Sequence, residues 1–209
     1  MAESFTTLTG PAAPYLEENV ATNVISVQRP HSAGPYKDPG DELFFGLRFD
    51  EDGTEIPDFV LNRPRYRDAR FLIAGANFGC ASSREAAVTA LSAFGIRCVI
   101  APSVGDIFFN NCFKFGVLPV LLPEADVLAL AEEASSGGKS GDFIADLNEN
   151  SLTAPSGQTF EISLPEFRRT QLLEGLDEIA LTMRSADDIA AFHRAAADER
   201  PYLYGLERP

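Results

Sequence analysis

The sequence has little positive charge, few cysteines and no long apolar run, and each shortage excludes a class of protein. Lysine and arginine number 17 against 31 aspartates and glutamates, which gives a formal net charge of -14. Because a surface this acidic repels DNA, RNA and anionic lipid, we expect no nucleic-acid partner. No stretch approaches the roughly 18 apolar residues of a membrane span, so we expect no membrane partner either.

The cysteines argue against a disulfide framework and against a metal site. Cys80, Cys98 and Cys112 are odd in number and widely spaced, and they form no Cys-x-x-Cys pair. The first residues contain neither the basic nor the apolar region of a secretion signal. We therefore predict a cytoplasmic protein that holds no metal with its own residues.

Apolar runs and turn residues predict an α/β fold with one core. The most regular part is 68–122, where strands at 69–74, 98–101 and 117–122 alternate with helices at 82–94 and 106–113. This order is typical of a parallel sheet with right-handed crossovers. The β-branched stretch 23–27 predicts a further short strand, and the Pro- and Gly-rich stretch 29–40 predicts a long loop.

The second half of the chain predicts helices around a small antiparallel sheet. Residues 123–134 have the spacing of an amphipathic helix with Val127, Leu128, Leu130 and Ala131 facing inward. Residues 143–162 alternate like strands separated by turns. Helices are expected at 165–175 and at 187–197.

The strand-to-helix junction at 79–85 carries the strongest chemical signal. Ser82 and Glu85 have the spacing of a capping box. The unpaired amides of a helix start attract anions, and Arg84 adds a planar fork suited to a carboxylate or phosphate. Ser82 or Ser83 would place a hydroxyl beside that anion. The alternative is an ordinary helix cap, and the stretch lacks both the phosphate-loop and the dinucleotide-binding patterns.

A resemblance to a known family favours the functional interpretation. Residues 77–85 resemble the Asn-Phe-Gly-Cys-Gly-Ser-Ser-Arg-Glu signature of isopropylmalate dehydratase small subunits, members of the aconitase swivel-domain superfamily. Further stretches resemble that family in the expected order, and the likeness covers nearly the whole chain. These stretches are 57–62, 99–103, 106–111, 118–120, 167–169 and 175–182.

The resemblance implies a fold and a reaction. The fold would be a swivelling three-layer β/β/α domain over 1–209, with its core at about 15–182 and a C-terminal helix and tail at 183–209. The domain would close over a large subunit that carries a [4Fe-4S] cluster, so this chain would bind no cofactor itself. The pair would be a hydro-lyase that removes water from a hydroxy di- or tricarboxylate and adds it back, converting 2-isopropylmalate to 3-isopropylmalate in leucine biosynthesis.

The resemblance also implies roles for three residues. Ser82 would be the base that takes a proton from the carbon beside a carboxylate, and Arg84 would bind a substrate carboxylate. Ser83 would support the site through hydrogen bonds. Iron in the partner would act as a Lewis acid on the substrate.

The sequence departs from the family pattern around this site. The family stretch Asn-Val-Asp-Thr-Asp corresponds to residues 19–23, where Ala21 and Asn23 replace both acids. Ala86 stands where the family has His. Asn23, with Arg29 and His31 of the following loop, is a candidate substrate-binding group, although for Arg29 and His31 the pattern favours solvated loop residues.

Two further interpretations follow from these departures. The chain is either a divergent member that acts on another alkylmalate, such as citramalate or dimethylmalate, or a catalytically inactive module that binds anions. A third hypothesis is a stand-alone enzyme that uses Cys80, which would need a thiol with a lowered pKa at the helix start.

Overall fold

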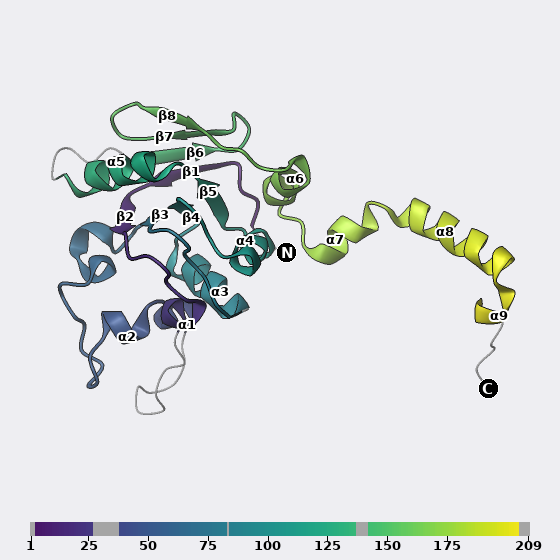
Figure 1. The fold of residues 1–209 in the computed structure, drawn as a ribbon, viewed down its shortest axis with the longest axis horizontal. Coiled ribbons are helices and arrows are strands. Elements are labelled where there is room, and N and C mark those ends of the chain that lie inside the picture. The colour runs from purple at the N-terminus through teal and green to yellow at the C-terminus, as the bar shows by residue number, and fades with distance from the viewer. Residues whose placement is uncertain (1–2, 27–37, 83, 137–141, 205–209) are drawn as a thin grey trace.

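A computed structural model of the chain describes residues 3–26, 38–82, 84–136 and 142–204. Two four-stranded sheets lie against each other, and helices cover the far face of the second sheet (Figure 1). The first sheet is antiparallel, with the strand order β1-β6-β7-β8, and the second is parallel, with the order β2-β3-β4-β5. This arrangement confirms the predicted three-layer β/β/α fold.

The elements follow the chain in a simple order. The strands are β1 (Thr7–Gly10), β2 (Ala12–Tyr15), β3 (Phe71–Ala74), β4 (Cys98–Ala101), β5 (Leu118–Leu121), β6 (Phe143–Asp146), β7 (Ser151–Thr153) and β8 (Thr159–Glu161). The α-helices are α1 (Thr22–Ile25), α2 (Phe45–Arg48), α3 (Glu85–Phe94), α4 (Asp106–Lys114), α5 (Glu124–Ser135), α6 (Glu166–Glu174), α7 (Glu178–Met183), α8 (Ala186–Glu199) and α9 (Pro201–Tyr204). Short 3-10 turns lie at η2 (Pro39–Glu42), η3 (Val60–Asn62) and η4 (Pro64–Tyr66).

The parallel sheet is buried on both faces, which explains its continuous apolar runs. Along β3, Phe71 and Ile73 pack toward the antiparallel sheet, while Leu72 and Ala74 pack toward the helices. Alternate residues of β4 divide in the same way between the two clusters. The predicted strands β3, β4 and β5 are confirmed, and their parallel pairing is confirmed too.

The N-terminal strands were not predicted, and they move the start of the core. The sequence placed that start near residue 15, but Phe5 and Leu8 are already buried between the sheets. β2 was missed because it is short and contains Pro14. Proline is tolerated at this position because β2 lies at the edge of its sheet, where one side of the strand needs no donor.

Two other local predictions were wrong. The stretch 23–27 was predicted as a strand, but residues 23–25 belong to α1, a single turn between the bridges Ala21–Cys80 and Ser26–Leu43. Tertiary contacts here outweigh the β-propensity of the side chains. Leu128 was predicted to face inward from α5, but it is exposed while Val127 and Leu130 are buried.

A buried polar pair stabilises the long segment that connects β2 and β3. The Arg48 guanidinium donates from Nε to the Asn62 side-chain oxygen at 3.1 Å. The Asn62 amide group donates to the carbonyls of Arg48 at 2.6 Å and Ile56 at 2.9 Å. Arg48 also lies over the rings of Phe49 and Phe94, so its charge is enclosed by aromatic faces.

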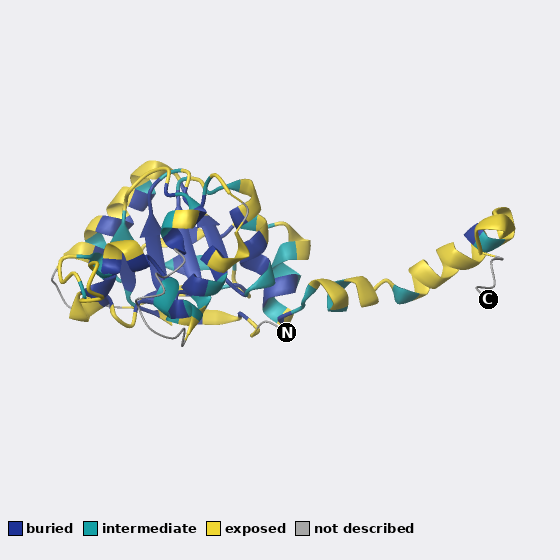
Figure 2. Cartoon of the chain, turned by 90° about the horizontal axis from the view of Figure 1, so that it is seen from below, coloured by how far each residue is buried: buried dark blue, intermediate teal, exposed yellow. Residues whose placement is uncertain are grey.

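The C-terminal helices extend away from this body. Figures 1 and 2 show α8 and α9 as a projecting segment, and most of its surface is exposed. Among the described residues, no helix is both long enough and apolar enough to cross a bilayer.

Replacing Asn62 tests the buried pair. Asn62→Ala removes both donors and the acceptor for Arg48, and we expect it to lower the free energy of unfolding by about 3 kcal/mol. Urea denaturation of the isolated chain measures the change. Gln158→Ala, at an exposed amide side chain in the turn before β8, is the control and should change the stability by less than about 1 kcal/mol. Equal effects of the two substitutions would contradict the assignment.

Candidate active site

The loop that follows β3 lies at the carboxyl edge of the parallel sheet, where ligands bind in open α/β sheets. The segment after β2 holds one side of this loop through its backbone. The Gly79 amide donates to the Val20 carbonyl at 2.8 Å, and the Asn19 amide donates to the Ala76 carbonyl at 2.9 Å. Ala21 and Cys80 then form a parallel bridge.

The segment after β4 holds the other side of the loop. The Asn77 amide donates to the Ser103 hydroxyl at 2.9 Å, and the Gly105 amide donates to the Phe78 carbonyl at 2.8 Å. Gly79 is required between the two segments because its φ is +70° and a Cβ there would overlap the ring of Phe108. The small residues therefore let three chain segments meet at one edge.

Ser82 lies at the surface of this junction, beside a buried threonine of α1. The Thr22 hydroxyl donates to the Ser82 carbonyl at 2.7 Å. The two hydroxyl oxygens, Thr22 Oγ1 and Ser82 Oγ, are 3.4 Å apart. Because the single hydroxyl proton of Thr22 is directed at the carbonyl, only Ser82 can donate in this second contact. Thr22 thus holds the backbone of Ser82 and accepts from its side chain.

The helix start beside Ser82 differs from the sequence prediction. The capping box of Ser82 and Glu85 is wrong, because α3 begins at Glu85 and its N-cap is Arg84, with no side-chain cap. Ser82 lies two residues before that cap and contacts Thr22 instead. The first amides of α3 lack helical partners and favour an anion. Exposed Arg84 adds a positive charge at the same place.

The structure brings together three of the predicted site residues. Ser82 and Arg84 both precede α3, and exposed Asn23 follows Thr22, whose hydroxyl contacts Ser82. Ser83, Arg29 and His31 lie outside the described residues. The sequence analysis missed Thr22 as a functional residue. The available signal was that Thr22 matches the family stretch while the residues on either side of it, Ala21 and Asn23, do not.

Comparisons with known proteins agree with this geometry. The model of the aconitase C-terminal domain matches residues 3–125. A small subunit of 3-isopropylmalate dehydratase from Jannaschia sp. is 48% identical over 201 residues, covering 96% of this chain and all of that protein. The chain belongs to the family of 3-isopropylmalate dehydratase small subunits.

Other relatives of this small subunit support the same assignment. The protein of that name from Paramagnetospirillum magneticum is 47% identical over 96% of this chain and all of its own length. The model of the C-terminal domain of 3-isopropylmalate dehydratase small subunits matches residues 178–205. A 3-isopropylmalate dehydratase structure from Methanocaldococcus jannaschii has a TM-score of 0.57 and 23% identity, over 88% of this chain and 98% of its own. At that identity the structure supports the fold alone.

One departure of this small subunit from the family signature has a backbone consequence. Ala81 stands where the family signature has Gly, and its φ is +70°. Any residue with a Cβ is strained in this left-handed region. The alanine therefore keeps the turn of the family loop at a cost in conformational energy.

The cysteines of the small subunit show no metal arrangement. Cys98 and Cys112 are buried in the core, and burial raises the pKa of both thiols. Cys80 is half-buried, and its Sγ contacts the Asn19 carbonyl at 3.3 Å. Among the described residues, no three His, Cys, Asp or Glu side chains are grouped closely enough to hold a metal.

A cavity near the loop is too small to enclose a substrate by itself. Its volume is about 50 Å³, against several hundred for typical ligand sites. It is lined by Leu16, Glu18, Ala74, Gly75, Ala76, Pro102, Glu124, Val127 and Leu128. Ser82 and Arg84 lie outside it, on the open surface, where a second protein could complete the site.

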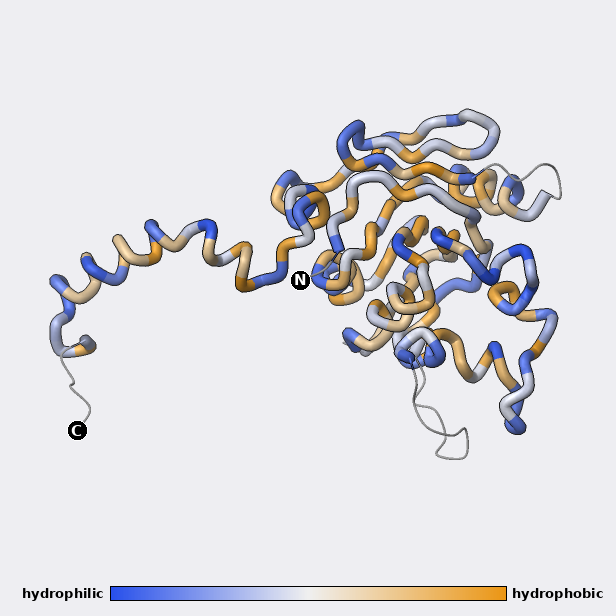
Figure 3. Tube along the Cα trace, turned by 180° about the vertical axis from the view of Figure 1, so that it is seen from behind, coloured by the Kyte–Doolittle hydropathy of each residue, from blue (hydrophilic) through white to orange (hydrophobic). Residues whose placement is uncertain are grey.

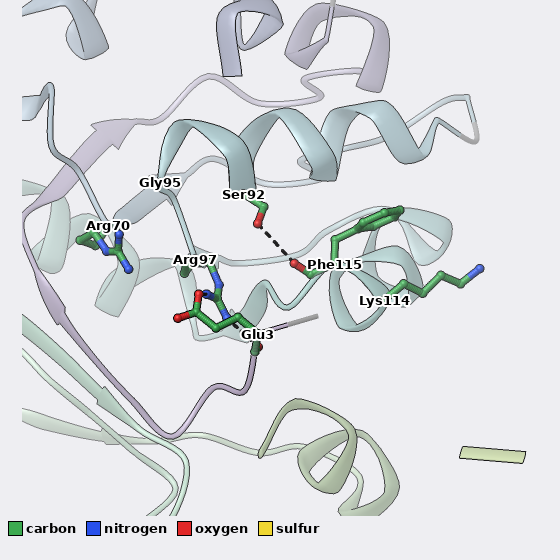
Figure 4. Close-up of a pocket in the computed structure, with 7 residues that line it drawn as sticks. All are labelled: Glu3, Arg70, Ser92, Gly95, Arg97, Lys114 and Phe115. Carbon is green, nitrogen blue, oxygen red and sulfur yellow. Dashed lines mark hydrogen bonds and ion pairs between the residues drawn. The ribbon is translucent and has the colours of Figure 1, made fainter. Parts of the chain in front are cut away.

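A larger cavity of about 250 Å³ lies at the opposite, amino edge of the sheet, before β3 and β4 (Figure 4). Two of its three cationic groups, Arg97 and Lys114, already have acidic partners in the described chain, and Arg70 is the third. The Arg97 guanidinium binds the Glu3 carboxylate at 2.6 Å, and Lys114 pairs with Glu85 at 3.5 Å and Glu178 at 3.1 Å. We interpret this cavity as a junction that anchors the N-terminal segment.

Replacing Ala81 with the family residue tests the backbone strain. Ala81→Gly removes the strain of the left-handed conformation and so stabilises the folded state. Glycine also gives the unfolded chain more conformational freedom, which offsets part of this effect. We therefore expect the free energy of unfolding to rise by about 0.5 kcal/mol. Ala86→Gly, in the first turn of α3, is the matched control and should lower stability by about 0.5–1 kcal/mol. Urea denaturation of both variants measures the two signs. A lower free energy of unfolding for Ala81→Gly would contradict the assigned backbone strain.

Proposed function

We propose that this small subunit supplies one half of the active site of 3-isopropylmalate dehydratase, a hydro-lyase of leucine biosynthesis. A large subunit with a [4Fe-4S] cluster would supply the other half. The observation that carries the proposal is the exposed Ser82, held by buried Thr22 beside Arg84 and the first amides of α3. We place the assembled enzyme in the cytoplasm.

The proposed role of Arg84 is to bind a substrate carboxylate. A guanidinium offers two parallel N–H donors that match the two oxygens of a carboxylate. The first amides of α3 add donors and a positive dipole end. In a chain of net charge -14, this local arrangement is what allows a dicarboxylate such as 2-isopropylmalate to approach.

The proposed role of Ser82 is proton transfer. As an alkoxide, Ser82 Oγ would take the proton from the carbon beside a carboxylate, while the hydroxyl of the neighbouring carbon leaves and, with a proton from an acid of the large subunit, becomes water. In the second half, the hydroxyl of a water would add to the carbon that lost its proton, and the remaining proton of that water would return to the acid. Ser82 would give its proton to the carbon that lost the hydroxyl, which completes the isomerisation. The amides of α3 and Arg84 stabilise the negative charge on Oγ. The cluster would act as the Lewis acid in the partner.

Thr22 would position Ser82 without touching substrate. Its hydroxyl donates to the Ser82 carbonyl, and this bond fixes the peptide group next to the Cα that carries the Ser82 side chain. Since Thr22 has no second proton, it cannot donate to the Ser82 alkoxide. Stabilisation of the charged form is therefore left to Arg84 and α3.

The departures at Ala21 and Asn23 support a different substrate as the second candidate function. Asn23 lies on α1 next to Thr22, so a changed side chain there borders the proposed site. An amide keeps hydrogen bonding but carries no charge and transfers no proton. Assays of the assembled enzyme with isopropylmalate, citramalate and dimethylmalate separate these cases. If the assembled enzyme turns over none of these acids, the remaining interpretation is a module that binds anions without catalysis.

Removing the Ser82 hydroxyl tests the proposed base. In the assembled enzyme, Ser82→Ala should lower kcat by about a thousandfold or more and leave subunit assembly intact. Ser92→Ala, at the far end of α3, is the control and should retain near wild-type turnover. Near wild-type turnover of Ser82→Ala would rule out the assignment.

Removing the Thr22 hydroxyl tests the positioning role. Thr22→Val keeps the shape of the side chain, and we expect kcat to fall about ten- to a hundredfold with a smaller change in KM, because orientation is lost. Thr22→Ser restores the hydroxyl and should recover most of the rate. Equal loss in both variants would indicate a packing role alone.

A further inference from the structure

The C-terminal arm, defined as residues 186–204 of α8 and α9, has no apolar partner among the described residues of the body. Figures 1 and 2 show it projecting from the body, and Ala196 is its one buried residue. Its large apolar side chains face solvent, and the hydropathy tube alternates between apolar and polar along it (Figure 3). Exposed residues of this kind are Ile189, Phe192, Tyr202, Leu203 and Tyr204.

The arm has an ordered shape of its own. α9 turns back against α8, and the ring of His193 lies 6.3 Å from Tyr204 and 6.1 Å from Phe192. Ala196 is buried beneath this turn. Because the aromatic rings are already gathered, a partner would meet a preformed surface and lose little entropy in ordering it.

Helix α7, which precedes the arm, contacts the body through a charged pair. Lys114 at the end of α4 pairs with Glu178 at the start of α7, 3.1 Å apart. Ile179 and Met183 of α7 are also exposed, so apolar surface continues from the root of the arm to its tip. Together these side chains expose several hundred Å² of apolar surface, roughly the share of one partner in a stable interface.

Charge argues against parallel pairing with a second copy. Asp187 and Asp188 begin α8, whereas its C-terminal end is mixed in charge, since Arg200 lies 3.7 Å from Glu199. Parallel pairing of two α8 helices would place Asp187 and Asp188 against the same acids of the second copy, which is unfavourable.

We propose that the C-terminal arm docks onto the large subunit of the same enzyme. This inference rests on the proposed function, which supplies the partner. The complementary site would be an apolar groove with lysine or arginine at one end of its rim, matching Asp187 and Asp188 at the start of α8. Docking at the arm would hold the subunits together while leaving the loop at Ser82 free to meet the other half of the active site.

The test uses the full chain and the large subunit encoded with it. Phe192→Ser removes a ring that is 65% exposed. We expect the dissociation constant of the two subunits, measured anaerobically by biolayer interferometry, to rise at least about tenfold. Phe167→Ser on α6, where the ring is 56% exposed, is the matched control and should change it less than about twofold. Both variants should unfold at the wild-type urea midpoint.

Each other outcome overturns the docking proposal in a distinguishable way. If Phe192→Ser binds as tightly as wild type and the complex is active, the arm is not the interface and the proposed function stands. If wild type binds no large subunit, the proposed function fails as well. If the isolated chain is a dimer that Phe192→Ser dissociates, the arm is a contact between copies.

Discussion

The hydrogen bond from the Gly79 amide to the Val20 carbonyl joins the segment after β2 to the loop after β3, and the candidate site depends on it. With this contact, Thr22 reaches the Ser82 carbonyl and Ala21 pairs with Cys80. The contact is possible because Gly79 has no side chain on the face that packs against Phe108. Ser82 is thus positioned by backbone geometry together with the Thr22 hydroxyl.

The charge distribution of the subunit is consistent with the same arrangement. The chain carries a net charge of -14, yet exposed Arg84 and the first amides of α3 put positive charge at the proposed site. Glu85 in that first turn would weaken the site, but Lys114 lies 3.5 Å from its carboxylate and offsets part of the charge. Lys114 also contacts Glu178 of α7, so one side chain links the site helix to the base of the C-terminal arm.

Much of the fold could be predicted because the strong signals are local. The apolar runs of β3, β4 and β5 can be satisfied only by a sheet covered on both faces, and the glycine-rich junction marks the turn into α3. The strand predicted at 23–27 was wrong because β-branched residues prefer strands only weakly. The bridges of Ala21 and Ser26 to distant residues impose a helical turn there.

The sequence by itself determined the family and the three central strands, and it named Ser82 and Arg84 as candidates for the site, because these are carried by contiguous motifs and apolar periodicity. Only the tertiary structure decided that Thr22 holds Ser82, since the two residues are 60 positions apart and meet through the sheet edge. It also decided that Ser82 is not a helix cap. The sequence likewise could not predict that the apolar face of the arm is exposed. An amphipathic helix has the same residue pattern whether its partner lies in the same chain or in another.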